Sequence, residues 1–188
     1  MELAEALRRR RMVRRYTGAP IEPAAVERIV AAGLAAPTAG DSRGVALITV
    51  TTAAGITAVA AACGEPAWVT RGRQPWLSTA AALVVVCLEP EAYRERYSAA
   101  DKDPAVLTAV PWWWVDGGAA LEAILLAAVA EGFGAGFLGG HRCGDLGEML
   151  GVSSDVIVLG VVTLGHPAPQ PTRPRRPGRK RWHRERWG

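Results

Sequence analysis

Hydrophobic and polar positions follow a helical rhythm along several stretches of the chain. These stretches predict helices over residues 2–11, 23–35, 53–62, 117–131 and 145–150. Pro23 suits the first turn of the second helix, because a missing backbone N–H costs nothing there. The helix over 117–131 is apolar on nearly all sides, so we expect it to be buried, with Asp116 as its N-cap and Gly132 at its end.

Shorter apolar runs rich in β-branched residues predict buried strands over residues 45–51, 83–88 and 156–164. A glycine-rich run, GFGAGFLGG over 132–140, predicts a further strand whose backbone lies close to another group. Residues 89–111 are charged and bounded by prolines, which predicts a loop and the most mobile section. Helices that alternate with strands favour an α+β or α/β fold with helices packed on a central sheet.

The length of 188 residues and a hydrophobic content of 49% allow one sizeable core, so we predict a single domain over 1–188. Six arginines and no acid lie within residues 8–15, and eight basic residues against Glu185 alone follow from Arg173 onward. The body between these basic poles is acidic. Residues 1–20 are expected to form an N-terminal helix with a basic run, and 167–188 an extended basic arm. Such poles favour nucleic acid, an anionic membrane or a phosphorylated ligand as partner.

Several classes of site have no support in the sequence. The cysteines Cys63, Cys87 and Cys143 are odd in number and form no CxxC pair, which favours reduced thiols, in buried packing before any reactive role. The three histidines are scattered, so we expect no metal site. No signal-peptide pattern is present, and the longest apolar stretches are far shorter than a membrane span. We therefore expect a cytoplasmic protein with no membrane partner.

Three segments could bind an anionic, planar ligand. The run RRRRMVRR (8–15) offers guanidinium groups that match phosphate oxygens, although exposed arginines also serve as a solvated face. AAPTAGDS (35–42) offers hydroxyls and backbone N–H groups, or is an ordinary turn. GFLGG (136–140) lets a ligand lie against the main chain, or is a simple turn after a strand. No P-loop lysine motif is present. Anion-binding poles and glycine contacts without an acid/base set favour a cofactor that brings its own chemistry, so we assign no catalytic side chain.

Together these segments resemble motifs of the FMN-dependent nitroreductase family, in the same order over nearly the whole chain. They are RRRRMVRRYTGAPI (8–21), AAGLAAPTAGDSRG (31–44), DGGAALEAILLAAVAEGFGAGFLGG (116–140) and LGVSSDVIVLGVVTLGHPAPQPTRPRRP (150–177). The resemblance implies an α+β fold with a central mixed or antiparallel sheet flanked by helices. It also implies an intertwined homodimer with FMN at the subunit interface.

The same resemblance assigns roles to residues. It implies FMN phosphate and ribityl contacts for Arg10, Arg11, Met12 and Arg14, joined at the phosphate by Arg173 and Arg175. The loop around the flavin ring and ribityl chain would be Pro37, Thr38, Ala39 and Asp41. Gln74 would reach the pyrimidine edge, with Arg71 or Arg73 near N1 and C2. The segment passing flavin N5 would be Leu138, Gly139 and Gly140.

The implied activity is transfer of hydride from NAD(P)H through FMN to a small-molecule acceptor such as a nitroaromatic, quinone or enone. Met12 stands where the family usually has serine, and Asp41 where it has asparagine. These departures keep open an alternative, a non-catalytic flavin-binding or effector protein on the same fold. Nucleic-acid binding is disfavoured by the acidic body. The Trp112–Trp114 cluster either covers the flavin or packs an interface.

Overall fold

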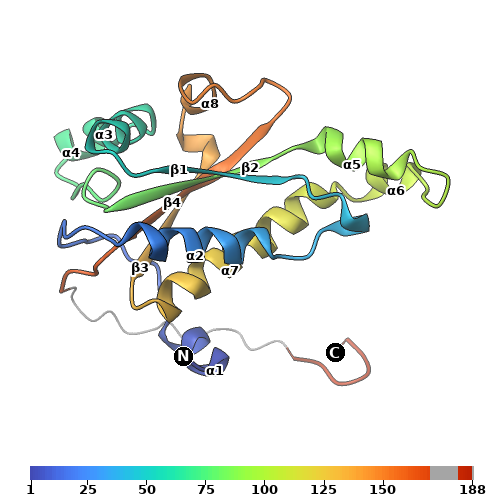
Figure 1. Cartoon of the computed structure of the whole chain (residues 1–188), viewed down its shortest axis with the longest axis horizontal. Coiled ribbons are helices and arrows are strands. Elements are labelled where there is room, and N and C mark those ends of the chain that lie inside the picture. The colour runs from blue at the N-terminus through green and yellow to red at the C-terminus, as the bar shows by residue number, and fades with distance from the viewer. Residues whose placement is uncertain (170–181, 188) are drawn as a thin grey trace.

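A computed structural model describes residues 1–169 and 182–187 and shows a sheet of four antiparallel strands between two layers of helices (Figure 1). The sheet order is β1-β2-β4-β3, with strands β1 (Val45–Val50), β2 (Ala82–Leu88), β3 (Gly134–Gly139) and β4 (Ile157–Gly165). All four strands lie where the apolar runs predict them. The expected α+β class with an antiparallel central sheet is confirmed.

The helices divide between the two faces of the sheet. Helices α2 (Pro23–Leu34) and α7 (Trp112–Ala130) cover one face, and α3 (Ala53–Ala62), α4 (Glu65–Thr70) and α8 (Leu146–Met149) lie on the other (Figure 1). The remaining elements are α1 (Leu3–Arg9), α5 (Pro90–Tyr97), α6 (Ala105–Ala109) and the 3₁₀ turns η1 (Ala39–Asp41) and η2 (Gly140–Arg142).

Strand β2 is buried along its whole length because it faces a hydrophobic core on each side. Leu83 and Val85 pack with Val59 of α3, and Val84 and the other alternate residues pack with Ile124 of α7. Successive side chains of a strand point to opposite faces, so a continuous apolar run is needed where both faces are covered. This double burial explains the sequence LVVVCL.

The structure corrects two expectations about the middle of the chain. Residues 89–111 are not a plain loop, since they contain α5 and α6. Helix α7 begins at Trp112, with Pro111 as its N-cap, so Asp116 lies inside the helix and does not cap it. Asp116 is only 5% exposed, and its carboxylate accepts hydrogen bonds from two other segments instead.

The expectation that every apolar stretch is far shorter than a membrane span is wrong for α7. This helix is long and apolar enough to cross a membrane by length and composition, a test that core helices of other proteins pass as well. It contacts α2 and all four strands, which makes it a core helix of this domain. Even so, only 33% of its most apolar window is buried within one chain. Part of this apolar helix is therefore not covered by the rest of the described chain.

Candidate functional site

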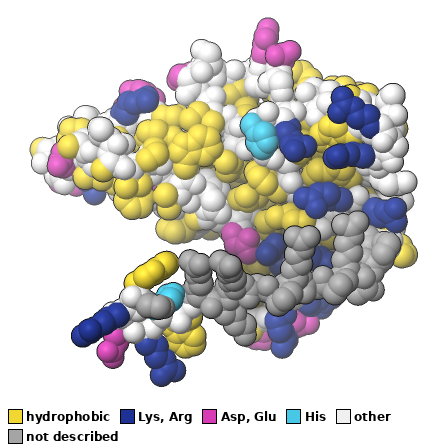
Figure 2. Space-filling view, turned by 180° about the vertical axis from the view of Figure 1, so that it is seen from behind, with side chains coloured by type: hydrophobic (Ala, Val, Ile, Leu, Met, Phe, Trp, Pro, Cys, Tyr) yellow, Lys and Arg dark blue, Asp and Glu magenta, His cyan; other side chains and the backbone are white. Residues whose placement is uncertain are grey.

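A pocket of about 1310 Å³ lies between the arginine run, strand β3 and the loop that precedes β2. Its polar lining is rich in guanidinium groups, from Arg8, Arg9, Arg10, Arg11, Arg14, Arg15, Arg73 and Arg142. Its apolar and neutral lining includes Met12, Trp68, Gln74, Trp76, Phe137, Leu138 and Gly139. Figure 2 shows Lys and Arg side chains gathered on one side of the molecule beside exposed hydrophobic atoms. The combination suits a ligand with an anionic end and an apolar body.

The backbone of the arginine run is fixed against the edge of β3. Met12 forms a parallel bridge with Ala135, and the Val13 N–H donates to the Ala135 carbonyl over 2.8 Å. A Cβ added to Gly136 would collide with the Val13 carbonyl oxygen. Gly136 is thus required for the close approach of the arginine run to β3. This approach places residues Arg10 to Arg14 at the pocket.

Tyr16 anchors the far end of the run. Its hydroxyl lies 2.6 Å from the Thr163 Oγ1 and donates to the Val13 carbonyl at 2.9 Å, and its ring packs on Gly165. Burial raises the pKa of Tyr16 to about 12, against a smaller opposing effect of the Thr163 hydrogen bond. The tyrosine that follows the basic run therefore holds that run onto β4.

Most of the pocket's positive charge has no carboxylate partner within the described part of the chain. Arg10 pairs with Glu122 of α7 at 3.1 Å, and Arg9 pairs with Glu5 at 3.0 Å. Among the residues that the structure describes, no ion pair is formed by the other lining arginines, Arg8, Arg11, Arg14, Arg15, Arg73 and Arg142. Unpaired guanidinium groups gathered at one pocket favour a bound anion, above all a phosphate.

One wall of the pocket is held by a buried carboxylate. Glu65, 3% exposed, accepts hydrogen bonds from the backbone N–H groups of Trp76 at 2.6 Å, Leu77 at 2.6 Å and Ser78 at 3.0 Å. Trp76 is thereby fixed beneath the guanidinium of Arg14, which lies 5.3 Å from the ring centroid. The geometry is that of a cation–π contact. Sequence reasoning missed Glu65, because the backbone N–H groups that donate to it lie more than ten residues away in the chain.

The end of β3 carries the predicted segment Leu138–Gly140. Leu138 and Gly139 line the pocket, whereas Gly140 does not. A Cβ on Gly140 would collide with the Val158 carbonyl of β4, so this glycine is explained by strand packing. A Cβ on Gly139 would lie 2.9 Å from the His141 ring.

The predicted loop Pro37–Asp41 lies elsewhere in the protomer. Pro37, Thr38 and Asp41 line a second pocket of about 580 Å³ at the C-terminal end of α2, and Ala39 lies beside it. The loop is held by hydrogen bonds, from the Ala39 N–H to Asp116 Oδ2 at 2.7 Å and from the Arg43 N–H to Thr38 Oγ1 at 3.1 Å. A single chain does not bring this loop to the arginine-lined pocket.

Asp41 is neutralised within its own loop. Its carboxylate pairs with the Arg43 guanidinium at 3.0 Å, and the hydrogen bonds from that guanidinium hold the pKa of Asp41 below its usual value. Both residues adopt positive φ, 58° at Asp41 and 52° at Arg43. The negative charge that replaces the family's asparagine is therefore balanced two residues away.

Some of the other residues expected at the site line the arginine-lined pocket, and others do not. Gln74 and Arg73 line it, but Arg71 does not, and Arg173 and Arg175 lie outside the described residues. The Trp112–Trp114 cluster starts α7 and does not line it; Trp113 stacks edge-on against Tyr93 with ring centroids 6.0 Å apart. Within residues 1–169 and 182–187, no group of three His, Cys, Asp or Glu side chains is placed to hold a metal.

Trp68, Trp76 and Arg142 are lining residues that sequence reasoning did not find. The tryptophans lie in and after α4, a helix that the sequence pattern did not predict. Arg142 follows the glycine-rich exit of β3 by two residues. Arg142 could have been found from the sequence, because it is a basic residue just after a segment that was expected to contact the ligand.

Comparison with known proteins agrees with this architecture. The pattern of the Nitroreductase family matches residues 7–166. A protein of Archaeoglobus fulgidus described as an NADH dehydrogenase/NAD(P)H nitroreductase is 31% identical over 162 residues, covering 84% of this chain and 81% of that protein. The NADPH-flavin oxidoreductase of Vibrio harveyi is 29% identical over 176 residues, covering 92% and 69%. The structure of the Vibrio harveyi NADPH:FMN oxidoreductase with NAD⁺ superposes with a TM-score of 0.76 at 27% identity, over 99% of this chain and 78% of that one.

Proposed function

The chain belongs to the nitroreductase family, and from this premise we propose that it is an FMN-dependent NAD(P)H oxidoreductase that reduces a small organic acceptor. The observation that carries the proposal is the arginine-lined pocket, with its apolar wall and its close backbone approach at β3. Both relatives are described as flavin or NAD(P)H enzymes, which supports the same cofactor and co-substrate here.

The residues present fit FMN. Six lining arginines without carboxylate partners in the described chain supply the charge that a phosphate needs. Two of them, Arg11 and Arg14, flank the Met12-Val13 pair that is joined to β3. Met12 offers no hydroxyl to the phosphate, but it is one residue among many donors. The apolar surfaces of Trp76 and Leu138 suit a flat ring, and Gly139 lets such a ring approach the main chain.

A homodimer would complete this site. The loop Pro37–Asp41 lies apart from the arginine-lined pocket within one chain, while the resemblance assigns both to one flavin. A second copy of the chain can supply that loop. The partly uncovered apolar surface of α7, and the exposed Trp114 and Val115 at its start, provide the hydrophobic area that a stable interface needs.

FMN, when bound, supplies hydride acceptance from NAD(P)H and hydride donation to the acceptor. The protein's part is position and charge. Glu65 and the β3 bridge hold the two walls, and Arg73 places a fixed positive charge that favours negative charge on a bound ligand. No side chain of the pocket is assigned proton transfer. Nitroaromatics, quinones and enones are the acceptor class proposed.

The test starts with the colour of the purified protein. We expect a yellow protein that releases FMN, identified by mass spectrometry, and that oxidises NADH or NADPH only when an acceptor such as menadione is added. A colourless protein that neither binds added FMN nor quenches its fluorescence refutes the proposal. FMN-loaded protein that consumes no NAD(P)H with any acceptor supports the alternative, a non-catalytic flavin-binding protein. Gel filtration of the same sample tests the dimer.

A further inference from the structure

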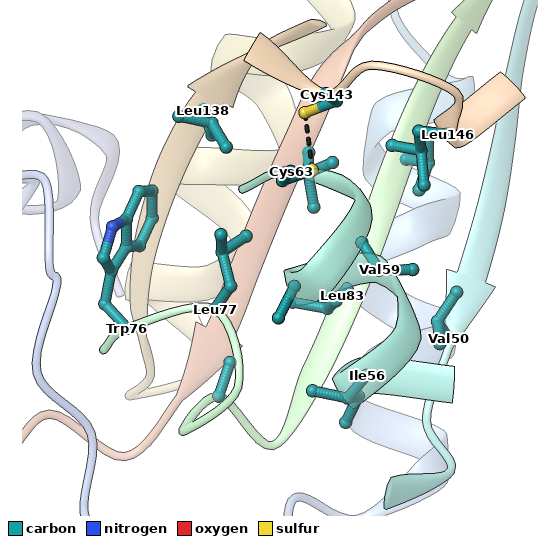
Figure 3. Close-up of a cluster of buried hydrophobic side chains, with 14 of the residues drawn as sticks. Val50, Ile56, Val59, Cys63, Trp76, Leu77, Leu83, Leu138, Cys143 and Leu146 are labelled. Atoms are coloured by element: carbon teal, nitrogen blue, oxygen red, sulfur yellow. Dashed lines mark hydrogen bonds between the residues drawn. The ribbon is translucent and has the colours of Figure 1, made fainter. Parts of the chain in front are cut away.

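Two buried thiols meet on the face of the sheet covered by α3. The sulfur atoms of Cys63 and Cys143 lie 2.6 Å apart, although the cysteines are 80 positions apart in the chain (Figure 3). Both cysteines are free, and each is 1% exposed. A disulfide bond has a length of about 2.05 Å, so little movement separates this pair from a covalent link.

Both thiols adjoin the walls of the arginine-lined pocket. Cys63 is the C-cap of α3 and precedes Glu65, which fixes Trp76. Cys143 directly follows η2 and the lining residue Arg142. Figure 3 shows the pair between Leu138 of β3 and Leu146 of α8, with Trp76 on the same side of the sheet. A bond between the sulfurs would therefore tie the β3 exit to the segment that carries the tryptophan wall.

We propose that Cys63 and Cys143 are a site of reversible oxidation, which takes hydroperoxides or small-molecule disulfides as oxidants and closes as a Cys63–Cys143 disulfide. With a hydroperoxide, one sulfur displaces the alcohol or water and becomes a sulfenic acid. The second sulfur then attacks it, forms the S–S bond and releases water. Overall, two thiols and one hydroperoxide give one disulfide, one alcohol or water from the peroxide, and one water. With a small-molecule disulfide, one protein sulfur attacks its S–S bond and releases one small thiol, and the second protein sulfur then displaces the other small thiol from the mixed disulfide.

Cys143 is the sulfur that reacts first with the oxidant. The S–H of Cys63 donates to it, which lowers the pKa of Cys143 and raises that of Cys63. The neighbours Arg142 and Gly144 are exposed, so a small local opening of this turn brings the sulfur to solvent. Cys63, which is 1% exposed at the C-terminal end of α3, acts as the resolving thiol.

Cys87 provides a matched control. It is buried in the same core, 2% exposed, but has no sulfur contact among the described residues. Its thiol pKa is raised by burial, which makes it the less reactive sulfur. The three thiols could form three different pairs, so the identity of the pair formed reports on the folded geometry and not on general oxidation.

The experiment uses the full-length protein, treated with hydrogen peroxide or glutathione disulfide, then alkylated in denaturant and weighed by intact mass spectrometry. We expect a species that has lost two hydrogens and carries one alkyl group, on Cys87, with a Cys63–Cys143 cross-linked peptide that dithiothreitol removes. C87S should keep the mass loss and the cross-link. C63S and C143S should each lose them.

Three outcomes would overturn the proposal. One is full alkylation of all three thiols after oxidant treatment of folded protein. Another is a link that includes Cys87, and the third is persistence of the two-hydrogen loss in C63S or C143S. Oxidation in urea, where the three pairs should form together, shows whether the selectivity comes from the fold. Because the readout is mass, a failure of the proposed flavin function would leave this result unaffected.

Discussion

Replacing Glu65 tests whether a buried carboxylate holds the tryptophan wall of the pocket. In Glu65→Ala, the N–H groups of Trp76 and Leu77 lose their acceptor while they remain buried. An unsatisfied buried donor costs about 1–3 kcal/mol, so two of them give a loss of about 4 kcal/mol in the free energy of unfolding. The Ser78 N–H is only part-buried and can turn to water at lower cost.

Glu65→Gln separates the hydrogen bonds from the charge. The two shortest bonds share Oε1, which a glutamine retains, whereas its amide N–H₂ would face the Ser78 N–H. We expect a loss of about 1.5 kcal/mol, between the alanine variant and wild type. The control is Glu148→Ala, at an exposed position of α8, where the change should stay within about 0.5 kcal/mol.

Urea unfolding followed by circular dichroism measures these differences. For a domain of this size the alanine variant should also melt about 8–16 °C lower. Hydrogen exchange of the Trp76 and Leu77 amides gives the local readout, since both should lose protection. The reasoning is refuted if Glu65→Ala unfolds at the midpoint of Glu148→Ala, or if glutamine destabilises as much as alanine.

Two further changes test how the arginine run is held. Gly136→Ala places a methyl group against the Val13 carbonyl, so it should lower the free energy of unfolding in urea by about 1–3 kcal/mol, as overpacking does. The control is Gly147→Ala, which meets only ordinary van der Waals contacts and should be near neutral. Equal effects of the two variants would contradict the close approach of Val13 to β3. Because burial raises the pKa of Tyr16 from 10.0 to about 12, its contribution to stability is fully present below pH 10 and is lost as pH rises to about 12, by up to about 2.7 kcal/mol. Tyr16→Phe should flatten that part of the pH–stability curve, and an unchanged slope would refute the assignment.

The sheet could be predicted from the sequence because its signals are local. Runs such as 83–88 are short, apolar and rich in β-branched residues. They form strands where both faces of the sheet are covered. The charged stretch 89–111 was misread for the converse reason. In α5 the buried residues are Pro90, Tyr93 and Tyr97, which form a narrow apolar stripe. The other residues of the helix are mostly polar, so the segment as a whole has the composition of a loop.

The family motifs in the sequence anticipate part of the lining of the arginine-lined pocket, while the roles of these residues stay predictions. Eight of the residues named from the sequence line one pocket: Arg10, Arg11, Met12, Arg14, Arg73, Gln74, Leu138 and Gly139. The glycines look alike in sequence, yet the structure separates them. Gly139 lines the pocket, while Gly140 is required by the carbonyl of Val158 on the neighbouring strand. Such a distinction needs the strand pairing, which no local pattern contains.

Asp116 and Glu65 show why acidic residues in apolar surroundings are hard to interpret from sequence. Asp116 resembles an N-cap, but Ala39 and Tyr93, far away in the chain, are its donors. A buried carboxylate must be hydrogen-bonded, so each of these acids fixes whichever loop supplies its donors.

The loop at Ala39 illustrates the consequence. Its neighbours Asp41 and Arg43 adopt left-handed backbone conformations, which are strained for residues other than glycine. The Asp116 bond at 2.7 Å and the Asp41–Arg43 pair offset that strain and keep the loop in one shape. A loop already ordered in the free chain suits the proposed site between two copies, because the entropy of ordering it is then lost on folding and not on binding.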